Sequence, residues 1–198
     1  MNNPCNITEI VTTLIGVGGT IAGTILGWIL NSISQKGKLK ISVSSWKDYF
    51  EYNNIGSMVP SASKEQTELY HFEVVLDIYN SSKNAKIMRN IKIVFCDKKK
   101  ELKSLIPNDN SSKRTSGPIS FYDEVSSLNI APQTVQQIKL HNGVWKQNNE
   151  IDFIWDTQKV YLLYENDKEK TKRILLHKES YCDYFQKHIA GENNNGQA

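Results

Sequence analysis

The chain has 198 residues, of which 39% are hydrophobic and 23% charged, and its formal net charge is +3. This length fits one domain with a short appendage, and the apolar content excludes a wholly disordered chain. So small a net charge gives no indication of a nucleic-acid partner, and we expect none. Asn, Ile and Lys, whose codons are AT-rich, are abundant, which is typical of a bacterial or phage genome of low GC content.

The N-terminal segment from Ile10 to Gln35 contains no ionisable side chain. Its 26 residues exceed the roughly 20 that a helix needs to cross a bilayer core about 30 Å thick. A cleaved signal peptide is disfavoured because the apolar stretch is too long and no basic residue precedes it. We therefore predict an uncleaved single-pass transmembrane helix over residues 10–35, after a short extracytoplasmic segment, residues 1–9. The alternative is a buried core helix of a soluble domain.

The flanking charges predict the orientation of this helix in the cell membrane. Lys36, Lys38 and Lys40 follow the span, whereas no Lys or Arg precedes it. The positive-inside rule then places the N-terminus outside and the C-terminal domain in the cytoplasm. Trp28 lies near the C-terminal end of the span, where an indole N–H can reach the membrane interface. A reversed, envelope-facing topology is the alternative.

The predicted helix carries a stripe of small residues of the glycine-zipper type. The stripe consists of Gly16, Gly19, Thr20, Gly23 and Gly27. Residues four apart lie on one helix face, and small side chains there let a second helix approach closely. Besides membrane lipid, we therefore expect as partner either a second copy of the chain or the transmembrane helix of another protein.

Residues 36–178 are predicted to form an all-β domain. In Glu68–Tyr79, aromatic and aliphatic side chains alternate with polar ones, which is typical of a half-buried strand. Further strands are predicted at 39–43, 87–96, 102–106, 119–125, 134–140, 150–155, 159–164 and 173–177. About eight or nine strands without an amphipathic helix between them favour an antiparallel β-sandwich of immunoglobulin-like architecture. Residues 179–198 are predicted to form a short helix and a disordered tail.

The strand that ends in Val74–Asn80, followed by a second strand that ends at Asp97, resembles membrane-tethered immunoglobulin-like modules of bacteria. The Cys–Trp–Cys arrangement of antibody domains is missing from the sequence. The letters of this strand pair are common to half-buried strands, so the sequence assigns no family.

No spacing of His, Cys, Asp or Glu matches a common metal module, and no Gly-rich phosphate loop lies outside the predicted span. The densest candidate set for zinc is His177, Cys182, Asp183 and His188. We expect these four residues to be solvated or packing residues, and we predict neither a metal nor a cofactor. An enzyme would require His71, Asp97 or His141 to converge on one pocket beside a nucleophile.

Three basic clusters, at 98–100 with Lys103, at 113–114 and at 168–173, are interpreted as solvated turns rather than as lipid-binding patches, because acidic residues dilute their charge. Together these observations predict a single-pass membrane-anchored protein. Its cytosol-facing sandwich is expected to act as a non-enzymatic protein-binding or scaffold module for an unidentified protein partner. An enzyme with a site in the sandwich loops is the remaining alternative.

Overall fold

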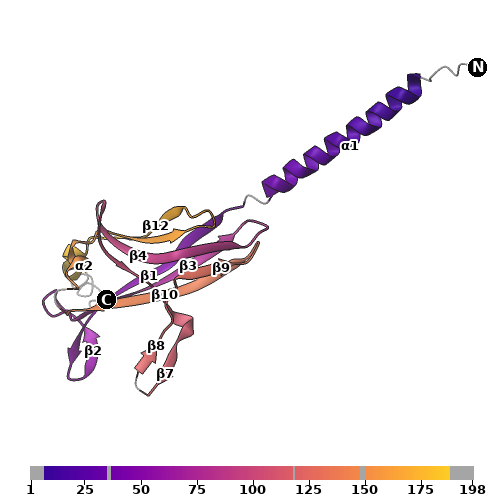
Figure 1. Cartoon of the computed structure of the whole chain (residues 1–198). Helices are drawn as coiled ribbons and strands as arrows, with labels where there is room; N and C mark the ends of the chain where they lie inside the picture. The colour runs from indigo at the N-terminus through magenta and orange to yellow at the C-terminus, as the bar shows by residue number, and fades with distance from the viewer. Residues whose placement is uncertain (1–6, 35–36, 118, 148–149, 188–198) are drawn as a thin grey trace, which may run out of the picture.

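The computed structural model of the chain describes residues 7–34, 37–117, 119–147 and 150–187. It begins with a long helix, α1 (Ile7–Ser34), which stands away from the rest of the chain in Figure 1. This helix was predicted over residues 10–35, and it begins three residues earlier. The predictions for residues 1–6, for Lys36 and for the tail 188–198 fall outside the described residues.

The body consists of two antiparallel sheets and a small hairpin (Figure 1). The first sheet has the order β2-β1-β3-β10-β6. Its strands are β1 (Leu39–Asn54), β2 (Ser57–Pro60), β3 (Leu69–Asn80), β6 (Asn108–Asp109) and β10 (Val135–Trp145). The second sheet has the order β12-β11-β4-β5, and β9 also pairs with β4. Its strands are β4 (Lys86–Asp97), β5 (Lys100–Leu105), β9 (Ser127–Ile130), β11 (Lys159–Glu165) and β12 (Thr171–Lys178).

The hairpin of β7 (Arg114–Ser116) and β8 (Ile119–Phe121) projects from the sandwich as an arm. A 3-10 turn, η1 (Asn110–Ser112), leads into it, and an ion pair between Arg114 and Asp123 joins its two sides. All six of its strand residues are exposed. The arm therefore adds no side chain from its strands to the core.

The core lies between the two sheets, and in β3 buried side chains alternate with outward ones along the strand. In β3, Tyr70, Phe72, Val74, Leu76 and Ile78 are all fully buried. The facing residues of the second sheet include Ile91, Ile93 and Phe95 of β4. Such a period of two is what a strand with one face in a core requires. The predicted antiparallel sandwich of immunoglobulin-like architecture is confirmed.

The detail differs from the prediction in three places. The described residues contain twelve strands instead of about eight or nine, because several have only two to four residues. β1 continues well beyond Val43, since a bulge between Val43 and Ser45 shifts its register and lets pairing with β3 go on. The predicted strand 150–155 is instead a turn and a short helix, α2 (Phe153–Asp156). Ile151, Ile154 and Trp155 are buried at helical, not alternating, spacing.

The C-terminal segment closes one end of the sandwich. A 3-10 turn, η2 (Tyr181–Asp183), is followed by helical residues up to 187. Tyr181 is fully buried, and Tyr184 and Phe185 pack against the core. The described part of this segment therefore belongs structurally to the sandwich.

Candidate functional site

The surface of α1 is apolar and uncovered by the sandwich. The apolar window Val11–Ile33 has a mean hydropathy of 1.7, and none of it is buried. Large side chains such as Leu14 and Trp28 are 66% and 71% exposed. Its 23 residues span about 35 Å at 1.5 Å per residue, enough for a bilayer core of about 30 Å.

The polar groups within this window are compatible with a lipid environment. The hydroxyl of Thr20 donates to the carbonyl oxygen of Gly16 at 2.9 Å, and that of Thr24 donates to the carbonyl oxygen of Thr20 at 2.8 Å. Hydroxyls that are bonded to their own helix backbone need no water partner.

The predicted stripe forms an open groove along α1. A Cβ placed at Gly16, Gly19, Gly23 or Gly27 would meet nothing within 4 Å. Together with Thr20, these positions fall on one side of the helix at 100° per residue. Helix association through this groove stays a prediction.

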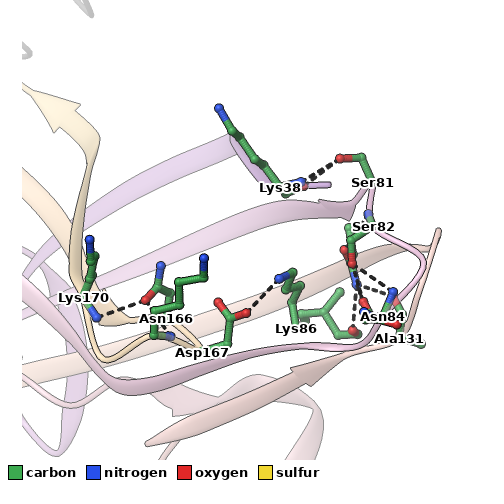
Figure 2. Close-up of polar contacts among 12 residues, drawn as sticks. Lys38, Ser81, Ser82, Asn84, Lys86, Ala131, Asn166, Asp167 and Lys170 are labelled. Atoms are coloured by element: carbon green, nitrogen blue, oxygen red, sulfur yellow. Dashed lines mark hydrogen bonds and ion pairs between the residues drawn. The ribbon is translucent and has the colours of Figure 1, made fainter. Parts of the chain in front are cut away.

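The first described residues after α1, Gly37 and Lys38, are held tightly against the β3–β4 turn, and Figure 2 shows the bonds of Lys38. Lys38 N–H donates to Ser81 Oγ at 2.9 Å, and the Ser81 hydroxyl donates to the Lys38 carbonyl oxygen at 3.0 Å. Any side chain at Gly37 would overlap the backbone of Ser81 and Ser82. The chain therefore leaves the sandwich directly beside the β3–β4 turn.

A buried asparagine joins the two sheets at this same end. Asn80 is fully buried, and its Nδ2 lies 2.9–3.1 Å from the carbonyl oxygens of Asn84, Ile130 and Ala131. Its Oδ1 accepts from the N–H of Ser82 at 2.9 Å. Because Asn80 belongs to β3 and Ile130 to β9, this side chain fixes the end of one sheet against the other.

The β11–β12 turn lies at this end too, as Figure 2 shows. Lys86 Nζ contacts Asp167 Oδ2 at 2.8 Å, and this bond lowers the pKa of Asp167. Asn166 Oδ1 accepts from the N–H groups of Lys168 and Lys170, both at 3.0 Å. The turn backbone is thus fixed, while the side chains of Lys168 and Lys170 are exposed.

The buried Asp48 was not predicted from the sequence. Its side chain is 6% exposed and accepts from Trp46 Nε1 and the Tyr70 hydroxyl, both at 2.7 Å, and from the Tyr181 hydroxyl at 2.9 Å. Burial raises the pKa of Asp48, although these donors and the nearby His177 oppose the shift. The available signal was the alternation of Trp46, Asp48 and Phe50, which places an acid on the apolar face.

The side chains considered for zinc do not gather. His177 Nε2 lies 3.1 Å from Glu179 Oε2 and 3.9 Å from Asp48 Oδ2, and its ring stacks on Trp46. Cys182 is exposed, and His188 lies outside the described residues. Among the residues with described positions, no three His, Cys, Asp or Glu side chains are arranged to hold a metal.

The three residues considered for an enzyme occupy two different sheets. His71 stacks on Tyr49 and lies 3.4 Å from Glu51 on the outer face of the first sheet. His141 lies opposite Glu73 on that same face, and partial burial lowers its pKa. Asp97 ends β4 in the second sheet. The geometry therefore brings the two histidines to one face without Asp97.

A family model agrees with this architecture. Residues 37–177 match the family model described as YopI Ig-like domain. The chain is 23% identical over 176 residues to the SPbeta prophage-derived uncharacterized protein YopI of Bacillus subtilis (strain 168), covering 86% of this chain and 97% of that protein. It is also similar to two solved structures. The first is structural genomics target SoR45, with a TM-score of 0.36 and 11% identity; the match covers 70% of this chain and 82% of that one. The second is an uncharacterized β-sandwich protein of Clostridium difficile 630, with a TM-score of 0.32 and 13% identity; the match covers 72% of this chain and 91% of that one.

Proposed function

The chain belongs to the family of YopI Ig-like domains, and from this premise we propose that it is a single-pass membrane protein. Its sandwich acts as a non-enzymatic binding or scaffold module at the cytoplasmic face of the cell membrane. The observation that carries the proposal is the uncovered apolar surface of α1, none of which packs on the sandwich. An exposed apolar surface of this size requires a lipid or protein cover.

The lysines that begin the body support the cytoplasmic orientation. Lys38 and Lys40 are exposed and follow the end of α1 within six residues. Basic residues this close to a transmembrane helix are enriched on its cytoplasmic side.

Membrane fractionation tests the anchor. The full-length chain is expected in the membrane pellet and resistant to alkaline carbonate. Replacing Ile21 and Ile25 by Lys should release it, since each Lys at the centre of a span costs about 2.5–3.5 kcal/mol. The control, Val135→Lys, changes an exposed side chain of the sandwich and should stay in the pellet. Wild-type chain in the supernatant would refute the proposal.

Thiol labelling tests the orientation. In intact cells an impermeant maleimide should label Cys5, and it should label Cys182 only after permeabilisation. Cys182 is exposed and can report, whereas Cys96 is buried. Labelling of Cys182 in intact cells would establish the reversed, envelope-facing topology instead.

The arm supports a role in protein binding. Ile119 and Phe121 of β8 are 57% and 50% exposed, although both are large apolar side chains. They are two apart in one strand and so face the same side. Crosslinking in cells should yield an adduct that is lost in the Ile119→Ser, Phe121→Ser variant and kept in Val135→Ser. If the adduct persists in the arm variant, the contact with the partner does not depend on Ile119 and Phe121.

A further inference from the structure

We propose that the end of the sandwich nearest α1 docks on anionic lipid headgroups through four lysines. We define this basic end by the exposed side chains of Lys38, Lys83, Lys168 and Lys170. The inference rests on the membrane anchoring proposed above, and it names the bilayer surface as a second contact of the chain, distinct from the helix itself.

The short connection holds this end close to the bilayer. α1 ends at Ser34, and Gly37 is already fixed against the β3–β4 turn. Three residue steps span at most about 11 Å. If the end of α1 lies at the membrane interface, the 81–84 turn therefore lies about one Debye length from the headgroups, which is about 10 Å at 0.1 M salt.

Tertiary structure brings the four lysines together from three separate segments. Lys38 begins the body, Lys83 lies in the β3–β4 turn, and Lys168 and Lys170 lie in the β11–β12 turn. The bonds of Lys38 to Ser81 and of Lys86 to Asp167 fix these segments at one end (Figure 2). The sequence alone separates these lysines by up to 132 residues.

The charge of the basic end remains available for a lipid surface. The Asp167 carboxylate is already paired with Lys86. Glu169 is the other acid of these turns, which leaves the four lysines with a net charge of +3. The fixed backbone of the 166–170 turn keeps two of the charges at the end of the sandwich.

A matched basic group lies at the opposite end of the sandwich. Residues 98–100 are three exposed lysines that follow the last residue of β4. β4 has 12 residues, so these lysines lie about 36 Å from Lys86 at 3.3 Å per residue. At several Debye lengths from the bilayer, they should contribute nothing to docking.

Each lysine near an anionic membrane surface contributes about 1 kcal/mol, which is about fivefold in the docking constant. Replacing Lys83, Lys168 and Lys170 by Gln should therefore lower that constant about 100-fold. This difference in docking constant should also vanish when the salt concentration rises from about 0.1 M to about 1 M, because the Debye length then falls to about 3 Å.

The test uses the full-length chain in nanodiscs. A bimane label on Ala85→Cys, in a chain whose Cys5 and Cys182 are replaced by Ser, reports on the exposed β3–β4 turn. The discs contain a headgroup spin-labelled lipid as quencher, in phosphatidylcholine alone or mixed with phosphatidylglycerol. Strong quenching is expected only with phosphatidylglycerol at low salt, and the basic-end triple variant should lose it. The control triple variant, Gln at 98–100, should keep it.

The outcomes separate the two proposals. Incorporation into discs with the same quenching in both lipids, or the same quenching in both triple variants, would overturn the docking proposal and leave the anchor intact. Failure of the chain to enter discs of either composition would overturn the anchor and the docking together.

Discussion

Replacing Tyr181 by Phe tests whether the buried Asp48 holds the C-terminal segment on the sandwich. Tyr181 is fully buried, and its hydroxyl donates to Asp48 Oδ2 at 2.9 Å. Burial and the nearby carboxylate raise the pKa of Tyr181, so this hydroxyl keeps its proton. The Phe ring preserves the contacts with Phe50 and Tyr70, whose ring centroids lie 6.0 and 6.2 Å away. The substitution therefore removes the hydroxyl that donates to Asp48 and keeps the packing of the ring.

A hydrogen bond to a charged group contributes about 1.5–3 kcal/mol. Asp48 keeps its bonds from Trp46 and Tyr70, so we expect the free energy of unfolding to fall within that range and no further. With an m-value of about 2 kcal/mol/M, the urea midpoint should fall by about 1 M. The assay is urea unfolding of the full-length chain in detergent, followed by near-UV circular dichroism, which reports on the packed aromatic residues of the sandwich.

Tyr164→Phe is the matched control. Tyr164 is 6% exposed, and its hydroxyl makes no hydrogen bond to any described residue. Tyr164→Phe should therefore lower the free energy of unfolding by less than about 0.5 kcal/mol. In an Asp48→Asn background, Tyr181→Phe should cost less, because the partner is then uncharged and the two changes share one bond. Equal losses for Tyr181→Phe and Tyr164→Phe, or strict additivity with Asp48→Asn, would refute the reasoning.

Three further changes have defined outcomes. Since burial raises the folded-state pKa of Asp48 above its usual 3.8, the folded state binds this proton more tightly than the unfolded state. The difference between the urea midpoints of the wild type and Asp48→Asn should therefore fall as the pH rises from about 4 to the pKa of Asp48 in the folded state. Above that pH the difference should stay level. Gly143→Ala should cost about 1–3 kcal/mol in urea unfolding, because its Cβ would lie 2.9 Å from His71 Cβ and 3.0 Å from the Tyr70 carbonyl oxygen. Gly23→Leu should weaken self-association by about 1 kcal/mol or more in a detergent crosslinking assay.

Each of these expectations has an outcome that contradicts it. A wild-type midpoint that rises relative to Asp48→Asn over the same pH range would reverse the sign of the linkage. An unchanged midpoint for Gly143→Ala would mean that β3 and β10 separate without cost. Ile25→Leu changes the opposite face of α1 and is the control. If Gly23→Leu crosslinks as strongly as Ile25→Leu, the stripe does not take part in helix association.

The sequence predicted those features that depend on local pattern. The uncharged run within 10–35 made α1 predictable, because a bilayer-length apolar helix needs only composition and length. The alternation in 68–79 gave β3 and its buried face, because side-chain direction in a strand follows from position alone. The same rule failed at 150–155, where three buried residues have helical spacing, since short apolar runs fit either period.

Only the tertiary structure decided which distant residues meet. The bulge after Val43 turned Asp48 into the core, where it meets Tyr70 and the distant Tyr181. Two-sheet closure placed the 166–170 turn against Lys86, at the end of the sandwich where Lys38 is bonded to Ser81, although the sequence favoured an ordinary solvated turn there. Strand register and sheet closure are set by the summed packing of the whole core, so no local window of sequence contains them.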